Sequence, residues 1–512
     1  MNNKKKKIIT IISSIIIVLI LVLAISYAFF STVLNGKDQV VKIGTLDLIL
    51  NETSEGISID NAIGVSDSEG MSGASSTFEL KNNRTKPVDY IIYLDDKAIG
   101  ETDTRMADKY LKYNLVKNGE ASGATLLTKT GSNPNRILDS GTIEGKGTNT
   151  YSLNLWITDE VDGDYSGQVF SGILRVEVSQ KKPGTNAVQL VKSKANEESL
   201  DYDTATEVQK KEVWTHTHPK TEQTEALIDY RYIGADPNNY VTFNDELWRI
   251  IGVFTVDDGT GKKEERLKLI RNESIGDYSW DNKDTSTGAE NNYGKNNWTD
   301  ARLNYLLNPG HESESVGGSL YWNSGSGTCY KGQNNATTSC DFTTTGLKDK
   351  AKNMIGDTLW YLGGTSNYTS ASDGLTSHFY TYERGTTVYS GRDTNFVGKV
   401  GLMYPSDYGY ATSGGSTTNR NACLNKELYN WDSSSYSDCK NNDWLYNSSI
   451  YQWTIMPRAF ISDYVFYVSA TGYVSYKNVY YSFGARPVVH LKSNIKITSG
   501  DGSSSNPYQL SF

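Results

Sequence analysis

A lysine run followed by a long apolar stretch at the amino end constrains this chain more than any other feature. Lys4 to Lys7 precede a stretch from Ile8 to Phe30 that contains no charged side chain. As a helix, such a stretch is long enough to cross the roughly 30 Å hydrocarbon core of a bilayer, and the lysines favour a cytoplasmic amino end. Ser26 and Ala28 are small residues of the kind that signal peptidase requires. We therefore predict export, with segment 1–35 either retained as a membrane anchor or cleaved as a signal.

The four cysteines fit an oxidising location. They form two local pairs, Cys329 with Cys340 and Cys423 with Cys439, in stretches rich in Gly, Ser and Asn that are typical of surface loops. Two local disulfides are the preferred connectivity of the three that four cysteines allow. A zinc site is the alternative, but neither pair has CxxC spacing or a nearby histidine. We therefore predict an extracellular or cell-surface protein.

Composition narrows the class of protein and the class of partner. The chain has 512 residues, which suggests two or three domains, and it contains 35 Tyr and 46 Gly but only 10 Pro. This composition is typical of folded, β-leaning domains rather than of a disordered chain. The formal net charge is −9. Because such a surface repels phosphate backbones, we do not expect nucleic acid as a partner.

Period-two alternation dominates residues 36–180 and predicts a β-sandwich. A short helix is expected near 106–111. The predicted strands are 40–50, 77–80, 88–94, 111–116, 151–158 and 169–179.

Residues 181–229 are charged and lose the alternation, which predicts a polar linker. This segment contains His216 and His218, whose spacing would suit a metal on a strand. A solvated pair in the linker is the preferred interpretation.

From residue 230 to 512 the chain is rich in aromatic residues and Gly, with few helical stretches. Segments 241–250 and 267–270 predict a hairpin, 297–307 has helical spacing, and short strands follow from 453 to 491. Trp453, Arg486 and Pro487 are assigned to structure, with Arg486 buried and paired. The predicted fold class is thus mainly β with some α: an amino-terminal helix, a sandwich and an α+β domain.

Two short motifs near the amino end carry a resemblance. Ser26 to Ser31 and the run Gly44-Thr45-Leu46-Asp47-Leu48 resemble the camelysin and TasA family of secreted Gram-positive matrix proteins, and the likeness extends to about Gln180. It implies a jelly-roll-like sandwich and, as a function, a subunit of a secreted biofilm-matrix fibre that self-associates. Camelysins have been described as metalloproteases, but a zincin needs two His one helical turn apart plus a Glu. This chain has no His before Trp214, so the protease function is not carried over.

A second resemblance rests on four ordered blocks. It is to uncharacterised surface domains of gut Firmicutes with a C-type-lectin-like fold, related in shape to the formylglycine-generating enzymes. The blocks are Phe243 to Gly252, Trp298 to Asn304, Gly401 to Gly409 and Gly484 to Val489. The formylglycine enzymes depend on a reactive cysteine pair near the end of the fold, and no cysteine follows Cys439. Oxidase activity is therefore a remote alternative.

No catalytic residue, metal ligand or cofactor is predicted. The chain has five His, all scattered, and neither a G-x-S-x-G elbow nor a P-loop. C-type lectins often bind sugars through calcium. Candidate oxygens lie in Trp280-Asp281-Asn282 and Asn442-Asp443-Trp444, but the Glu-Pro-Asn partner that the resemblance requires is absent. Calcium stays open, with turn capping as the alternative.

A tyrosine-rich stretch between Ser462 and Ser482 is the predicted ligand-binding face. Alternating valines predict strands with one apolar face inward and polar aromatics outward, and tyrosine with small polar neighbours suits recognition surfaces. A solvated surface of a tyrosine-rich fold is the alternative. The residues are Tyr464, Tyr467, Tyr473, Tyr476, Asn478, Tyr480 and Tyr481.

Together these observations predict an exported, non-enzymatic protein. A lectin-like domain on a sandwich stalk would bind an extracellular glycan or protein ligand, and the amino-terminal segment would be its contact with the membrane.

Overall fold

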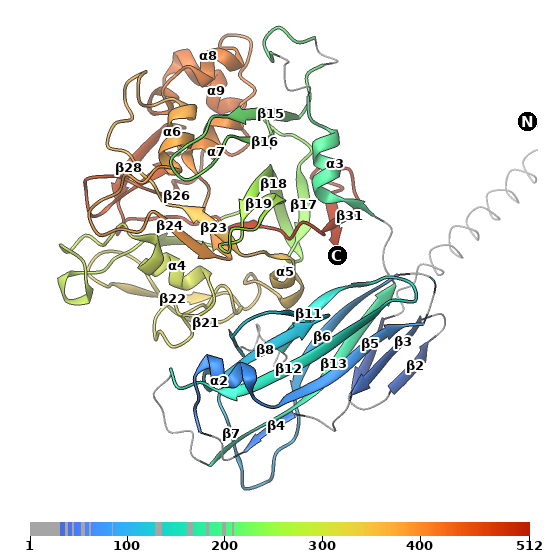
Figure 1. Ribbon diagram of the computed structural model, residues 1–512. Helices are drawn as coiled ribbons and strands as arrows, with labels where there is room; N and C mark the ends of the chain where they lie inside the picture. Colours follow the sequence, from blue (N-terminus) through green and yellow to red (C-terminus); the bar gives the residue numbers. More distant parts are fainter. Residues whose placement is uncertain are drawn as a thin grey trace, which may run out of the picture. The chain divides into compact units, whose positions relative to one another are not determined.

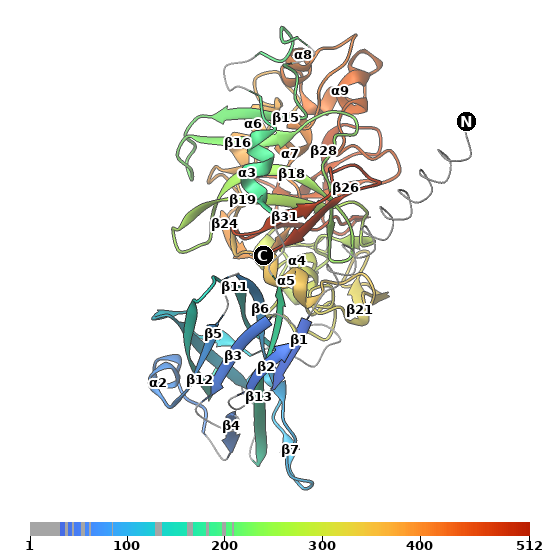
Figure 2. The same cartoon turned by 90° about the vertical axis from the view of Figure 1, so that its right-hand side faces the viewer.

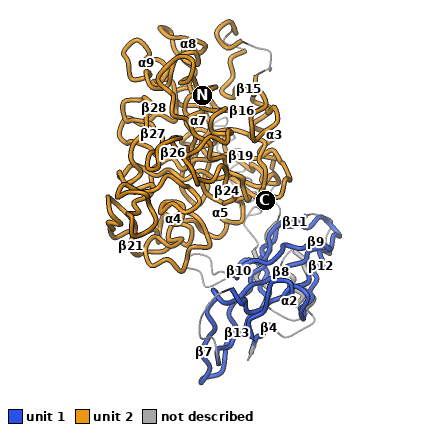
Figure 3. The backbone as a smooth tube through the Cα atoms, turned by 60° about the vertical axis from the view of Figure 1, so that its left-hand side comes forward, with its two compact units in different colours: residues 1–129, 134–181 blue, residues 130–133, 182–512 orange. Residues whose placement is uncertain are grey.

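The computed structural model of the protein describes residues 31–512 except 36–38, 44–45, 53–56, 61–62, 84, 86, 128–135, 161–166, 181–183, 197–200 and 207–208. Over the described residues strands predominate and helices are short, which confirms the mainly β fold class. The chain divides into two compact units, the first ending at Lys181 and the second running over Lys182–Phe512 (Figure 3).

Two sheets make up the described part of the first unit (Figures 1 and 2). The six-stranded sheet has the order β1-β13-β6-β11, with β4 and β7 also paired to β13. β7 runs parallel to β13, whereas the other strand pairs of this sheet are antiparallel. Its strands are β1 (Ser31–Asn35), β4 (Ile57–Asp60), β6 (Val88–Asp96), β7 (Thr104–Arg105), β11 (Arg136–Ile143) and β13 (Gln168–Gln180). The seven-stranded sheet is antiparallel, with the order β10-β8-β12-β5-β3-β2 and β9 beside β8. Its strands are β2 (Gln39–Ile43), β3 (Leu46–Glu52), β5 (Ser75–Asn82), β8 (Leu111–Lys117), β9 (Glu120–Ala121), β10 (Thr125–Leu126) and β12 (Thr148–Ile157).

Both sheets contribute to one core in the first unit. Leu80 of β5 and Leu153 of β12 join Ile92 of β6 and Leu174 of β13 in a single buried cluster. This is what strands with period-two alternation achieve when each presents one apolar face.

Two local predictions for the first unit need correction, and one helix was missed. The strand expected over 40–50 is two strands, β2 and β3, that pair antiparallel. The helix expected near 106–111 is a single 3-10 turn, η1 (Asp108–Tyr110). The helix α2 (Asp67–Ser72) was not expected, although Ser66 and Glu69 form a capping box at its start.

The described part of the second unit contains a ten-stranded sheet, a five-stranded sheet and two hairpins. The ten-stranded sheet runs β14-β31-β32-β17-β18-β19-β30-β25, with β16 pairing both β18 and β15. Its strands are β14 (Thr185–Asn186), β15 (Val213–His218), β16 (Leu227–Tyr232), β17 (Tyr240–Phe243), β18 (Glu246–Asp257), β19 (Lys263–Arg271), β25 (Val400–Gly401), β30 (Val488–His490), β31 (Lys496–Ser499) and β32 (Tyr508–Ser511).

The five-stranded sheet has the order β20-β29-β26-β27-β28. Its strands are β20 (Asp277–Ser279), β26 (Gln452–Pro457), β27 (Tyr464–Val468), β28 (Val474–Asn478) and β29 (Ser482–Gly484). The hairpins pair β21 (Ser326–Tyr330) with β22 (Thr337–Asp341) and β23 (Thr358–Tyr361) with β24 (Asn395–Gly398). The helices are α3 (Ala187–Ser193), η2 (Thr285–Thr287), η3 (Trp298–Asp300), α4 (Arg302–Leu307), α5 (Asp349–Met354), α6 (Thr376–Glu383), α7 (Pro405–Tyr410), α8 (Arg420–Leu424), η4 (Leu428–Asn430), η5 (Ser434–Tyr436) and α9 (Ser437–Asn441).

Large aromatic side chains fill the core of the second unit. Helical spacing predicted over 297–307 appears as η3 followed by α4, and it buries Trp298, Leu303, Leu306 and Leu307. The predicted hairpin of 241–250 with 267–270 is present as β18 and β19, but 241–250 is not one strand: it contains β17 and the start of β18, which pair antiparallel. Six tryptophans are fully buried: Trp248, Trp280, Trp298, Trp360, Trp431 and Trp453.

The polar linker predicted over 181–229 is wrong for most of the segment that the structure describes. β14 pairs with β31, α3 buries Val188 and Val191 against the core, and β15 forms a hairpin with β16. The expectation failed because three of the four polar side chains of β15, at Thr215, His216 and His218, are buried as well and find partners inside the unit. Hydropathy alone therefore does not identify this strand.

The structure confirms both predicted disulfides. Cys329 bonds Cys340 across the β21–β22 hairpin, and Cys423 of α8 bonds Cys439 of α9. All four cysteines are buried. The two bonds are consistent with an oxidising, extracellular location.

Within the described residues, no helix combines the length and apolar character that crossing a bilayer needs. The apolar stretch 8–30, to which the predicted anchor or signal belongs, lies outside those residues.

Candidate functional site

The predicted tyrosine face lies in the five-stranded sheet, but its residues do not share one face. Cross-strand partners project to the same side of a sheet. Tyr464 lies opposite Asn478, and Tyr476 lies opposite the buried Phe466. Tyr467 is one residue out of step with these positions and therefore projects to the other side. The expected single ligand face is thus divided between the two sides of β27 and β28.

The first side is packed rather than open. The guanidinium of Arg458 lies 3.6 Å from the ring centre of Tyr476, and the Asn478 amide donates a 3.0 Å hydrogen bond to Asp463. Tyr464 packs edge-on against Tyr476. All three predicted residues on this side are half-buried, so much of their surface already serves the fold.

Next to these positions, further aromatic rings contact one another in a continuous series. Tyr480 stacks on Tyr481 at 4.6 Å between ring centres. Phe483 stacks on Tyr451 at 5.1 Å. Tyr473 lies 6.1 Å from Tyr429. We call this set the aromatic band. Its members are Tyr293, Tyr429, Tyr451, Tyr473, Tyr480, Tyr481 and Phe483.

Tyr467 belongs to the support of the band rather than to its surface. Its side chain is buried, contacts Tyr451 and Tyr473, and its hydroxyl lies 3.3 Å from that of Tyr473. The prediction that Tyr467 faces outward is therefore wrong. β27 is an interior strand of the sheet, and both of its faces are covered.

Sequence reasoning missed the three most exposed members of the band. Tyr293, Tyr429 and Tyr451 expose 45%, 40% and 43% of their surface. Tyr293 and Tyr451 lie in loops and Tyr429 lies in η4, far from one another along the chain, so no local pattern groups them. Phe460, also missed, is 68% exposed with φ of 63°, a left-handed conformation that is rare for a bulky residue. The side-chain amide of Asn296 donates to the carbonyls on both sides of Phe460, at Arg458 and Ile461.

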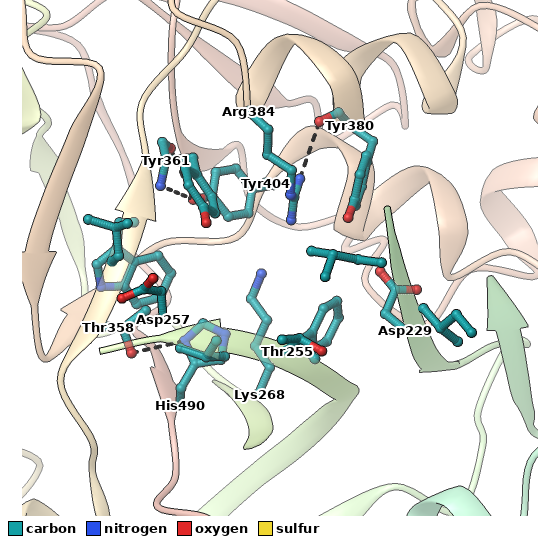
Figure 4. Close-up of a pocket in the computed structure, with 16 residues that line it drawn as sticks. Asp229, Thr255, Asp257, Lys268, Thr358, Tyr361, Tyr380, Arg384, Tyr404 and His490 are labelled. Carbon is teal, nitrogen blue, oxygen red and sulfur yellow. Dashed lines mark hydrogen bonds between the residues drawn. The ribbon is translucent and has the colours of Figure 1, made fainter. Parts of the chain in front are cut away.

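A small pocket of ≈ 40 Å³ lies at a second place in this unit (Figure 4). It is walled by Phe254, Trp360, Tyr380 and Tyr404, with Lys268 and Arg384 at its centre. The mouth includes Ile228, which is 36% exposed. None of these residues was singled out from the sequence, because β19, α6 and the β23 hairpin bring them together only in the fold.

A buried network of charges lies beside the pocket. Arg231 forms two hydrogen bonds with Asp229, at 3.0 and 2.8 Å, and a third of 2.9 Å with Asp407. Lys268 donates to the other oxygen of Asp407 at 2.5 Å. The positive charge of Arg231 helps to hold the pKa of Asp229 below its usual range, against the opposing effect of burial. Both carboxylates therefore stay ionised in the interior.

His216 and His218 are buried on β15, so the solvated linker pair is also wrong. His218 shares a 2.9 Å hydrogen bond with Asp229 and stacks on Tyr380, and His216 lies 3.2 Å from the guanidinium of Arg420. In the part of the chain that the structure describes, no group of three His, Cys, Asp or Glu residues is placed to hold a metal ion.

Acid sensitivity of the second unit follows from His216. Burial, followed by the positive charge of Arg420, lowers its pKa well below 6.5. The unfolded chain takes up a proton near pH 6.5 and the folded chain does not, so stability is complete above that pH and is lost as the pH falls. We expect the loss of unfolding free energy between pH 8 and pH 5.5 to be about 1.4 kcal/mol smaller in His216→Gln than in the wild type.

Urea unfolding at several pH values measures this difference. Glu383 acts in the opposite direction, because burial raises its pKa to about 7 and its contribution is lost as the pH rises. Glu383 is present in both proteins, so its effect cancels in the comparison. Parallel pH profiles for the two proteins would contradict the prediction.

Three of the candidate calcium oxygens accept hydrogen bonds from the backbone, whereas Asn282 Oδ1 and Asp443 Oδ2 are buried without a partner among the described residues. The Asp281 carboxylate accepts hydrogen bonds from the amides of Lys295 and Arg302, and Asp443 accepts one from Leu445. These contacts match the turn-capping interpretation.

The three residues assigned to structure lie in the interior. Trp453 is buried and donates through its indole N–H to the carbonyl of Tyr278. Arg486 is buried and donates to the Gln452 side chain and to the carbonyl of Arg271. Pro487 accepts a hydrogen bond from the Arg271 amide.

Comparison with known proteins identifies no family. No family model matches the chain, and no curated protein matches it significantly. The function is therefore argued from the surfaces described above.

Proposed function

We propose that the protein is exported and binds an extracellular ligand, without catalysis, through the aromatic band of its second unit. The observation that supports this is the packing of the band: half-exposed rings are held against one another before any ligand arrives. Rings in fixed positions lose little conformational entropy on binding, and aromatic residues contribute a large share of the energy of recognition surfaces.

A glycan is the ligand class that this surface suits best. The rings offer flat apolar faces for the C–H face of a sugar, and the phenolic oxygens both donate and accept hydrogen bonds. Lys477, whose ammonium lies 4.5 Å from the ring centre of Tyr481, adds one positive charge at the band. A protein ligand is the other class, and the test below separates the two.

The first unit serves in this proposal as the stalk. We infer that its two sheets form a jelly-roll-like sandwich, because both contribute to one core. The second unit is proposed to be lectin-like. Segment 1–35 would hold the protein at the membrane or be removed after export.

The test compares binding of immobilised glycans and of host-cell proteins by variants of the exposed ring positions. We expect Tyr293→Ala, Tyr429→Ala and Tyr451→Ala each to weaken glycan binding by at least about tenfold, as loss of a central aromatic contact does. Because these side chains are the most exposed in the band, the variants should fold.

Tyr382→Ala is the matched control. Tyr382 is a half-buried tyrosine of α6 that packs near His378, and its loss should leave binding unchanged. Equal affinity in all four variants would contradict a role for the band. If the protein binds only host-cell proteins and loses that binding in the same three variants, the band is still the binding site and the ligand is a protein rather than a glycan.

A further inference from the structure

We propose that the pocket at Lys268 and Arg384 is a binding site for a carboxylate group, separate from the aromatic band. Figure 4 shows the Lys268 ammonium and the Arg384 guanidinium pointing toward one another across the open centre of the pocket. Both side chains are more than nine-tenths buried. Two buried cations that converge on an open space are the arrangement that an anion would stabilise.

The hydrogen-bond donors at this centre exceed their acceptors. Arg384 donates through Nη1 to the carbonyl of Tyr380 and to Glu383, but its buried Nε–H meets no acceptor among the described residues. A buried donor without a partner costs about 1–3 kcal/mol, more when it is charged. The side chain of Lys268 donates to Asp407. A ligand oxygen between the two cations would accept from both.

The carboxylates that line the pocket are already engaged. Asp229 accepts from Arg231 and His218. Asp257 accepts from the backbone amides of Gly259 and Gly261. Asp407 pairs with Lys268 and Glu383 pairs with Arg384, so a ligand anion would add its hydrogen bonds to these pairs, above all at the unpartnered Nε–H of Arg384. Burial lowers the pKa of Lys268; Asp407 opposes this shift, and the like charges of Arg231 and Arg384 add to it to a smaller extent.

The size and walls of the pocket favour a small planar group. A volume of ≈ 40 Å³ is equivalent to about three water molecules. The guanidinium of Arg384 lies 3.7 Å from the ring centre of Tyr380, and the Lys268 ammonium lies 4.6 Å from that of Tyr404. Because flat rings border the space and a guanidinium matches two coplanar oxygens, a carboxylate fits better than a tetrahedral anion.

The carboxylate could come from two sources. A free acid as small as acetate would fill the pocket by itself. An acidic sugar would insert its carboxylate and leave the ring at the mouth, beside Ile228 and Thr255. The chemistry of recognition at Lys268 and Arg384 is the same in both cases.

The experiment titrates the full-length protein in detergent micelles with sodium acetate, sodium glucuronate, inorganic phosphate and neutral acetamide, with binding followed by calorimetry. We expect saturable binding of acetate and none of acetamide. Thr255→Trp should weaken acetate binding at least about tenfold, because the indole closes the mouth of the pocket and the charged hydrogen bonds are lost. Thr255 is half-buried at the mouth, so this variant leaves the charged network intact.

Arg384→Lys tests the cationic centre of the pocket, because it keeps the positive charge but removes the planar guanidinium with its paired N–H donors. This variant should also weaken acetate binding. Thr381→Trp, at an exposed position of α6, is the control and should bind acetate as the wild type does. Binding of acetate alone identifies a free acid, and binding of glucuronate as well identifies an acidic sugar. Tighter binding of phosphate than of acetate, or acetate binding that survives Thr255→Trp, would overturn the proposal. The band variants should leave acetate binding unchanged, so the two sites are tested independently.

Discussion

Replacing Arg231 with methionine will lower the free energy of unfolding of the second unit by about 3–5 kcal/mol. Arg231 is 1% exposed and bonds both Asp229 and Asp407. Methionine has a similar volume but no charge, so the two carboxylates would remain in the interior with only His218 and Lys268 beside them. A buried charge that loses its partner is among the largest single destabilising effects known in proteins.

Urea unfolding monitored by tryptophan fluorescence measures this loss. Lys220→Met is the matched control, because the ion pair of Lys220 with Glu225 is two-thirds exposed on both sides. Exposed ion pairs contribute little, so the control should unfold at the wild-type midpoint. If Arg231→Met also unfolds at the wild-type midpoint, the charge network does not stabilise the fold.

Removing the disulfide between Cys423 and Cys439 will lower the unfolding free energy by about 3 kcal/mol, since the bond closes a loop of 16 residues. The bond between Cys329 and Cys340 closes 11 residues, so its removal should cost slightly less. The two bonds lie in different elements, and their effects should add in the variant without cysteines.

The measurement is the midpoint of thermal unfolding. It is compared among variants in which both cysteines of a pair are replaced by Ala, the variant without cysteines, and the wild type with reductant. The reduced wild type should match the variant without cysteines. Four titratable thiols in protein isolated from its native host would contradict both disulfides in that setting and, with them, the predicted extracellular location.

The sequence predicted the elements whose side chains follow a simple period. β5 and β13 alternate, and Trp298 of η3 and Leu303 of α4 point inward, so their patterns matched the structure. β6, β8 and β12 also lie where strands were predicted, but their burial does not follow a strict alternation. β15 was missed because its buried positions hold Thr215, His216 and His218. Their partners, such as Asp229 and Arg420, are specified by tertiary contacts that no local pattern reveals.

The predicted ligand-binding residues stay a prediction, and the structure shows only how their side chains are placed. The tyrosine-rich stretch does contribute Tyr473, Tyr480 and Tyr481 to the aromatic band. Alternation could not show that β27 is covered on both sides, which buries Tyr467. The pocket could not be predicted at all, because Lys268 and Arg384 are separated by more than a hundred residues and neither lies in a recognisable motif.

The pairing of β14 with β31 brings the first strand of the second unit beside one of its last. Thr185 lies opposite Ile497, and the Asn186 side chain donates to the carbonyl of Ser493. β32, the last strand, pairs with β31 in turn, so a peptide bridge from β32 back to β14 would cross a short span. The backbone could then be opened instead at the exposed turn 259–261 of the β18–β19 hairpin. We therefore expect a circularly permuted form of this unit, joined and opened at these two places, to fold.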